Sequence, residues 1–90
     1  MSTNLQIWHI CQKSARHRYK KIAMIEAPEE EAALEASDYA VQTGKEAILI
    51  LGDSIESIQA RYYPDGMRYN FNTFTFERYD RDLKQWVMAR

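Results

Sequence analysis

Three side chains with nucleophilic or metal-binding capacity lie close together near the start of the sequence: His9, Cys11 and His17. A cysteine beside a histidine can act as a nucleophile, and the two residue types together can bind zinc. His9 and Cys11 would share one face of a strand, because they are two residues apart. No carboxylate stands at a spacing that would complete a zinc site. We therefore expect a half-buried histidine and a small core thiol, with no metal or cofactor. A metal or thiol site at His9 and Cys11 is the least favoured alternative.

Other signs of catalysis are weak. The acidic residues 29–31 are consecutive, so on a helix they would point in different directions around the axis and would suit a solvated first turn. Gly44, Gly52 and Gly66 are isolated from one another, so the sequence contains no glycine-rich phosphate-binding loop. These patterns favour a protein that is not an enzyme.

The segment from Lys13 to Lys21, KSARHRYKK, holds five basic side chains and one tyrosine. Such a segment can neutralise phosphates while its aromatic ring stacks on a base. The residues that we expect to contact a partner are Arg16, Arg18, Lys20 and Lys21 here, and Tyr62, Tyr63 and Tyr69 on an exposed surface that Arg61 and Arg68 would extend. The net charge of −1 and the lack of a nucleic-acid-binding motif make nucleic-acid binding the alternative function.

The clearest structural prediction is an amphipathic helix over residues 28–44. Pro28 suits the first position of a helix, acidic residues in the first turn suit its dipole, and Gly44 suits the left-handed residue that ends it. A period of 3.6 residues places mostly small side chains on one face, namely Ala33, Leu34, Ala36, Ser37, Ala40, Val41 and Gly44. A face of small residues predicts that the helix packs closely on a sheet.

The segments on either side of this helix are typical of strands. Residues 4–12 and 19–27 predict an antiparallel hairpin with a basic tip, without indicating which face of the first strand is buried. The apolar run Ala47–Leu51 predicts a strand that is covered on both faces. Residues 54–63 fit either a helix or a strand, and the turn at residues 64–66 that follows them favours a strand.

The last third of the chain is rich in aromatic residues. Residues 67–79 predict the longest strand, with a β-bulge near Asn72 and Thr73, where the aromatic residues change from odd to even positions. A turn over residues 80–83 and a closing strand over residues 84–88 complete the series. The predicted fold is one α+β domain over residues 1–90, a mostly antiparallel sheet with one helix on a face, in the order β-β-α-β-(β or α)-β-β.

Composition then favours one class of function. The chain is 46% hydrophobic, and eleven aromatic residues are more than a 90-residue core readily hides. Residues 1–25 carry five bases and no acid, whereas residues 26–43 carry six acids and no base. A polarised surface with exposed aromatic side chains is typical of a protein–protein interface.

We therefore expect a small, non-enzymatic module that binds a protein partner stoichiometrically, such as an inhibitor or modulator of a host defence or regulatory factor encoded by a phage or mobile element. An edge strand could also pair with a second copy to give a homodimer. A single cysteine and the lack of a long apolar run or a signal peptide predict a cytoplasmic protein with no membrane contact.

Overall fold

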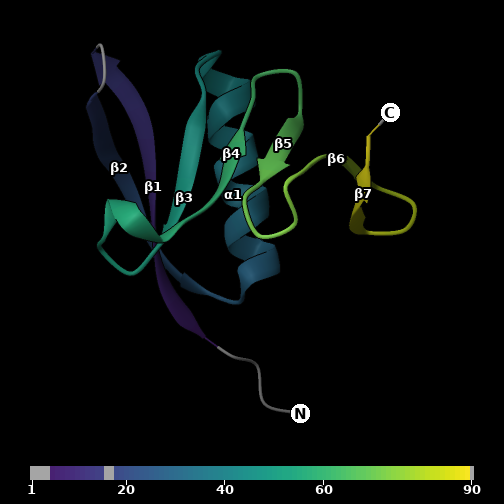
Figure 1. Ribbon diagram of the computed structural model, residues 1–90, viewed down its shortest axis with the longest axis horizontal. Coiled ribbons are helices and arrows are strands. Elements are labelled where there is room, and N and C mark those ends of the chain that lie inside the picture. Colours follow the sequence, from purple (N-terminus) through teal and green to yellow (C-terminus); the bar gives the residue numbers. More distant parts are fainter. Residues whose placement is uncertain (1–4, 16–17, 90) are drawn as a thin grey trace.

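In the part of the chain that the structure describes, the fold is one seven-stranded antiparallel sheet with a single helix on one face (Figure 1). The computed structural model describes residues 5–15 and 18–89. The elements along the chain are β1 (Gln6–Ala15), β2 (Arg18–Ala27), α1 (Glu29–Thr43), β3 (Ala47–Leu51), a 3-10 turn (Ile55–Ser57), β4 (Ile58–Tyr62), β5 (Met67–Asn70), β6 (Thr75–Asp80) and β7 (Gln85–Met88). This arrangement confirms the predicted fold class.

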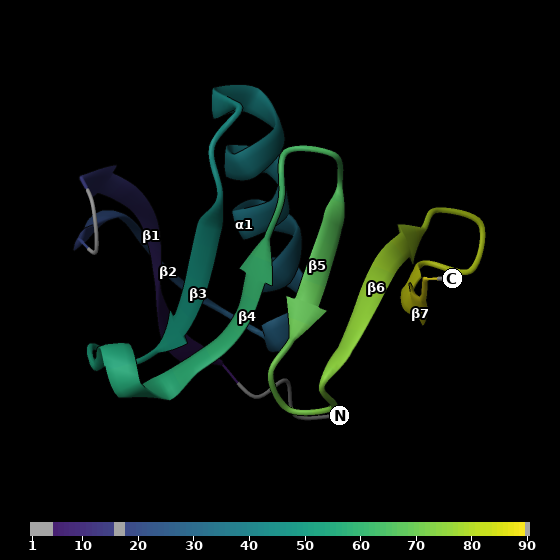
Figure 2. The same ribbon diagram turned by 45° about the horizontal axis from the view of Figure 1, so that its top comes forward.

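The strands lie in the order β2-β1-β3-β4-β5-β6-β7 (Figure 2). Since β2 and β3 both pair antiparallel with β1, they run parallel to each other, and α1 makes the crossover between them. All later connections join neighbouring strands. The helix α1 packs mainly against β1 to β4, and β6 and β7 turn away from the other strands in Figure 2. Among the described residues, no helix is long and apolar enough to span a membrane.

The helix has the predicted ends but buries a different stripe. Pro28 is its N-cap, and Gly44 ends it with φ +70°, the left-handed conformation that glycine adopts at little cost. The buried helix residues are Ala32, Ala33, Ala36 and Ala40. The prediction that Leu34 and Val41 face the sheet is wrong, because their side chains are 36% and 51% exposed. The stripe made only of alanine allows the closest approach of helix to sheet, and this requirement outweighs the larger apolar area of leucine and valine.

The core has two layers, one on each face of β3. Toward α1, the alanines of the helix meet Trp8, Ile10, Leu49 and Tyr62. The indole Nε1 of Trp8 donates a hydrogen bond of 3.0 Å to the carbonyl oxygen of Ala27. On the other face, a smaller buried cluster consists of Cys11, Ile48 and Ile50, with Tyr19 and Ile58 packed against it. The strand β3 is thus covered on both sides, as its continuous apolar run predicts.

The predicted long strand over residues 67–79 is instead a hairpin of β5 and β6. The carboxamide oxygen of Asn70 accepts from the amide of Asn72, and the carbonyl of Asn70 accepts from the amide of Phe74 at 2.8 Å. Phe74 takes φ +59°, which reverses the chain. The shift of the aromatic residues from odd to even positions around Asn72 therefore marks a turn and not a β-bulge. The side chain of Asn70 accepts a backbone hydrogen bond here, which replaces the pairing between strands.

The ambiguous segment at residues 54–63 contains both a short helical turn and a strand. The Ser54 side chain accepts from the amide of Glu56 and begins the 3-10 turn, after which Ile58–Tyr62 forms β4. The predicted turn at residues 64–66 is present, with the amide of Gly66 donating to the carbonyl of Tyr63 at 3.0 Å. The closing strand also forms, as β7.

Candidate functional site: the sheet face opposite the helix

The sheet face that points away from α1, here called the open face, is the main candidate for a functional surface. Residues that pair directly across antiparallel strands share a face, so the register assigns each side chain. Arg61 on β4 pairs with Tyr69 on β5, and Tyr69 pairs with Phe76 on β6. Ile48 on β3 pairs with Arg61 and belongs to the second core cluster. Arg61, Tyr69 and Phe76 therefore form one row across the open face.

Four rings on or beside β4 to β6 form an aromatic cluster, which consists of Tyr63, Tyr69, Phe71 and Phe76. The ring centroid of Tyr69 lies 5.1 Å from that of Phe71 and 4.8 Å from that of Phe76, and both pairs of rings meet edge to face. Tyr63 and Phe76 are 6.2 Å apart. These separations fall in the range in which aromatic pairs attract each other. The Phe76 side chain is nonetheless 49% exposed, so the cluster is ordered by internal contacts and still presents apolar area to solvent.

Arg61 borders the aromatic cluster and lies close to groups of two kinds. Its guanidinium carbon is 5.9 Å from the ring centroid of Phe71, within reach of a cation–π interaction. Its Nε lies 3.9 Å from a carboxylate oxygen of Glu46, too far for a hydrogen bond, and this buried Nε has no acceptor among the described residues. Arg61 thus places a positive charge and an unused donor beside the aromatic rings.

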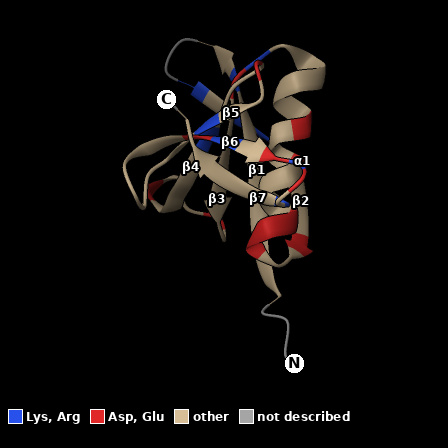
Figure 3. Cartoon of the chain, turned by 90° about the vertical axis from the view of Figure 1, so that its right-hand side faces the viewer, with Lys and Arg blue, Asp and Glu red and all other residues tan. Residues whose placement is uncertain are grey.

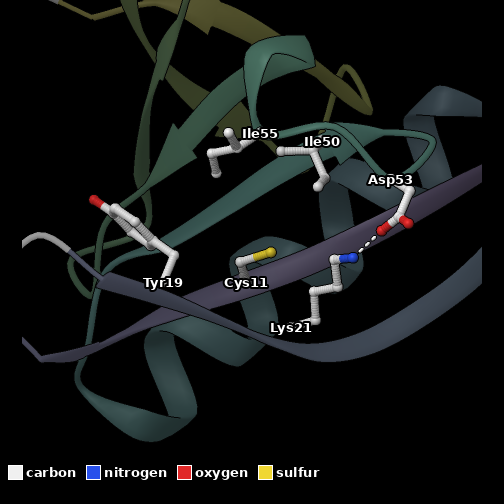
Figure 4. A pocket seen from close by; sticks show the side chains of 6 residues that line it. All are labelled: Cys11, Tyr19, Lys21, Ile50, Asp53 and Ile55. Carbon is white, nitrogen blue, oxygen red and sulfur yellow. Dashed lines mark hydrogen bonds and ion pairs between the residues drawn. The ribbon is translucent and has the colours of Figure 1, made fainter.

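A hollow of about 370 Å³ lies on the open face over β1, β2 and β3 (Figure 4). Cys11 and Ile50 lie between the Tyr19 ring on one side and the ion pair of Lys21 with Asp53 on the other. Ile55 completes the lining. The hollow offers a mainly apolar surface with one ion pair at its edge, which suits an apolar side chain of a partner better than a charged ligand.

The geometry of Cys11 and His9 does not suit nucleophilic chemistry. Burial raises the pKa of the Cys11 thiol above its usual value of 9.0, and Lys21 only partly opposes this effect. The thiol is therefore neutral at physiological pH and a poor nucleophile. His9 Nδ1 makes its hydrogen bond to the carbonyl oxygen of Gly52, so that nitrogen is the donor. Within residues 5–15 and 18–89, no three His, Cys, Asp or Glu side chains are grouped so as to hold a metal ion.

The predicted basic patch is divided by the structure. Arg16 and His17 lie outside the described residues, and Arg18 is exposed at the start of β2. Lys20 pairs with Gln12, which faces the helix side, whereas Lys21 pairs with Cys11 on the open face. Adjacent residues of a strand point to opposite faces, so these lysines cannot act as one patch on the sheet surface.

The three predicted tyrosines also separate. Tyr63 and Tyr69 lie in the aromatic cluster, but the prediction that Tyr62 is exposed is wrong, because it is fully buried beneath α1. Burial raises its pKa to about 12. The expected surface position of Arg68 is wrong for the same reason, since it pairs with Tyr62 across the strands on the helix side and is only 9% exposed.

Arg68 belongs to a buried network on the helix side. Its Nε donates to a carboxylate oxygen of Glu77 at 2.7 Å, and one of its amino groups donates to the hydroxyl of Tyr62 at 3.2 Å. Its guanidinium carbon lies 4.3 Å from the ring centroid of Trp86. This network links β4 to β7 on the helix side of the sheet, which gives it a structural role.

Phe71 and Phe76 are not among the contact residues that the sequence predicts. Their signal was the aromatic pattern of residues 67–79, which becomes informative once the chain is known to reverse after Asn70. Tyr69 then faces Phe76 directly, and both point to the open face.

The charges of the two sides differ. Acidic residues cluster on the outer surface of α1, as the red segments of the helix show in Figure 3, and Glu29, Glu30, Glu31, Glu35 and Asp38 are all exposed. On the open face, Lys21 is paired with Asp53, and Arg61 lies near Glu46. The open face therefore carries charges of both signs around its aromatic rings, whereas the outer side of α1 is acidic.

Comparison with known proteins gives no further guide to the site: no family model matches the chain, and no curated protein or solved structure matches it significantly.

Proposed function

We propose that this protein is a small, non-enzymatic binding module whose open face engages a protein partner. The observation that carries the proposal is the aromatic cluster, in which Phe76 is exposed and Tyr63, Tyr69 and Phe71 are half-buried on a sheet face that no described element covers. Exposed aromatic groups held by their neighbours lose little conformational freedom on binding, and such groups dominate binding hot spots. The module would act stoichiometrically, as an inhibitor or modulator does.

The pairing of charges favours a protein over a nucleic acid as the partner. A surface that binds phosphates needs basic groups free to release counterions. On the open face Lys21 is held by Asp53 and Arg61 lies near Glu46, so of its exposed basic side chains Lys13 and Arg78 are those with no ion pair among the described residues. The mainly apolar hollow on the same face, lined in part by Ile50 and Ile55, supports the same preference.

The test uses two substitutions of equal exposure on opposite sides. Phe76 on the open face is 49% exposed and Val41 on the outer side of α1 is 51% exposed. Wild type, Phe76→Ser and Val41→Ser are coupled to resin, incubated with cell lysate at low and high salt, and the retained proteins are quantified by mass spectrometry. Circular dichroism and urea unfolding establish that each variant is folded.

We expect at least one protein to be retained by the wild type and by Val41→Ser at both salt concentrations, and to be lost with Phe76→Ser. Equal retention by the two variants would contradict the proposal. Retention of nucleic acid alone, released by high salt, would instead support the alternative of a nucleic-acid-binding protein.

A further inference from the structure

The outer edge of β2 is a second candidate surface. Among the strands of residues 5–15 and 18–89, β2 is at one end of the sheet and pairs only with β1, so its other edge presents backbone groups that another strand can bind. It is ten residues long, whereas β7 at the opposite end has four. Ile22 and Met24 on β2 are 36% and 68% exposed. A long edge with exposed apolar side chains is well suited to strand pairing.

The charges along β2 are complementary to those of a second copy. Its first half carries Arg18, Lys20 and Lys21, and its second half carries Glu26. An antiparallel pair of β2 strands related by a two-fold axis places the basic half of one copy beside the acidic half of the other. Lysines on an edge strand oppose pairing with strands that offer them no acidic partner. A second copy of β2 does offer one, so this arrangement also provides specificity.

The register of β1 with β2 identifies which residues would meet. Ile10 pairs with Ala23 and Cys11 with Lys21, so Ile22 is an extra residue in a bulge. Because of this bulge, Lys21, Met24 and Glu26 all lie on the open face, although 21 is odd and the other two numbers are even. If the β2 strands of two copies pair antiparallel with Met24 opposite Met24, each side chain meets one on the same face of the sheet. Ala23 then lies opposite Ile25 of the second copy, and beyond the bulge Lys21 lies opposite Glu26 of the second copy.

We propose that the protein forms a homodimer by antiparallel pairing of β2 with β2 of a second copy, centred on Met24 and held in register by two symmetrical Lys21–Glu26 ion pairs. The two sheets then form one continuous sheet, and the two open faces adjoin. This dimer does not require that the open face bind a partner, and its test uses the purified protein alone.

The test is a charge swap followed by sedimentation equilibrium over a concentration series. Lys21→Glu and Glu26→Lys each place like charges opposite one another at both symmetrical contacts, so each should raise the dimer dissociation constant at least about tenfold. An equimolar mixture of the two variants restores both ion pairs in a heterodimer. The double variant, Lys21→Glu with Glu26→Lys, restores them in a homodimer. We expect both to regain the affinity of the wild type to within about threefold.

Two controls separate this register from other effects of charge. Asp53→Asn removes the ion pair that Lys21 makes within its own chain, and it should leave dimerisation unchanged or slightly stronger. Lys20→Glu changes the neighbouring lysine, which faces the other side and would meet Ala27, so it should weaken the dimer much less than Lys21→Glu.

A wild-type protein that stays monomeric at millimolar concentration would overturn the proposal. So would failure of the mixture and of the double variant to regain affinity, or equal weakening by Lys20→Glu and Lys21→Glu. Circular dichroism of each variant confirms that lost dimerisation is not lost folding. The partner capture with Phe76→Ser is read independently of these results.

Discussion

Tyr69 on β5 and Phe76 on β6 are direct cross-strand partners whose ring centroids lie 4.8 Å apart on the sheet face that the helix leaves uncovered. Tyr63 and Phe71 complete the cluster around them. The hairpin turn at Asn70–Phe74 creates this contact, because it reverses the chain. An odd-numbered residue of β5 and an even-numbered residue of β6 then meet on one face of the sheet. The candidate surface therefore depends on one local turn, and several properties of the protein follow from the contacts beneath and beside it.

Removal of the Tyr62 hydroxyl should lower the free energy of unfolding. Tyr62→Phe eliminates the hydrogen bond from Arg68 to this buried oxygen, at an expected loss of about 1 kcal/mol. Urea unfolding followed by circular dichroism measures the difference. Tyr63→Phe is the matched control, since Tyr63 is partly exposed on the opposite face, and it should change stability by less than about 0.5 kcal/mol. Equal effects of the two substitutions would contradict the assigned faces.

Two ion pairs of the sheet should differ sharply in strength. Glu77→Gln leaves the nearly buried Arg68 without its charged partner and should lower the free energy of unfolding by about 3 kcal/mol. Glu46→Gln disrupts the longer and more exposed contact with Arg61, and a loss below about 1 kcal/mol is expected. Both values come from urea titrations at the same ionic strength. A loss at Glu46 as large as that at Glu77 would be inconsistent with the observed burial.

Stability should decrease at alkaline pH in a way that depends on Tyr62. Burial raises the pKa of this hydroxyl from 10.0 to about 12, so the folded state keeps its proton where the unfolded state loses it. The contribution to stability is complete below pH 10 and is lost as the pH rises toward 12. Wild type, more stable than Tyr62→Phe by about 1 kcal/mol at neutral pH, should lose about 2 to 3 kcal/mol relative to this variant across the interval, so the difference in unfolding free energy changes sign. A pH-independent difference would argue against burial of the hydroxyl.

Close packing of α1 on the sheet should make its alanine stripe intolerant of larger side chains. Ala36 is fully buried against the sheet, and Ala36→Leu should lower the free energy of unfolding by about 1 to 3 kcal/mol through overpacking. Val41→Leu, on the exposed side of the same helix, serves as the control and should be nearly neutral. Thermal unfolding distinguishes the two. A neutral Ala36→Leu would mean that the helix lies further from the sheet than the structure places it.

Local signals in the sequence were sufficient for the helix ends, the strand β3 and the turn at residues 64–66. Each depends on one residue type with a specific backbone role, such as Gly44 at φ +70°, or on a continuous apolar run. The stripe that α1 buries was harder to predict, because the choice between Ala32 and Leu34 depends on how closely the helix approaches the sheet.

The faces of the aromatic residues could be predicted only in part. Alternation alone requires Tyr62 and Tyr63 to point in opposite directions, so one of the two had to be buried. The pairing of Tyr69 with Phe76 depends on register, and the bulge at Ile22 decides which face of the sheet Lys20 and Lys21 each take. Register arises from contacts between strands distant in sequence, which periodicity within one segment does not report.

The most direct test of the central claim maps the contact surface residue by residue. The protein is labelled with ¹⁵N and titrated with the partner recovered by affinity capture, and amide chemical-shift changes are recorded. We expect the largest changes at Tyr63, Tyr69 and Phe76 on the open face, with Glu35 and Val41 on the outer side of α1 unaffected. Changes concentrated on α1, with the amides of β4 to β6 unmoved, would contradict the account.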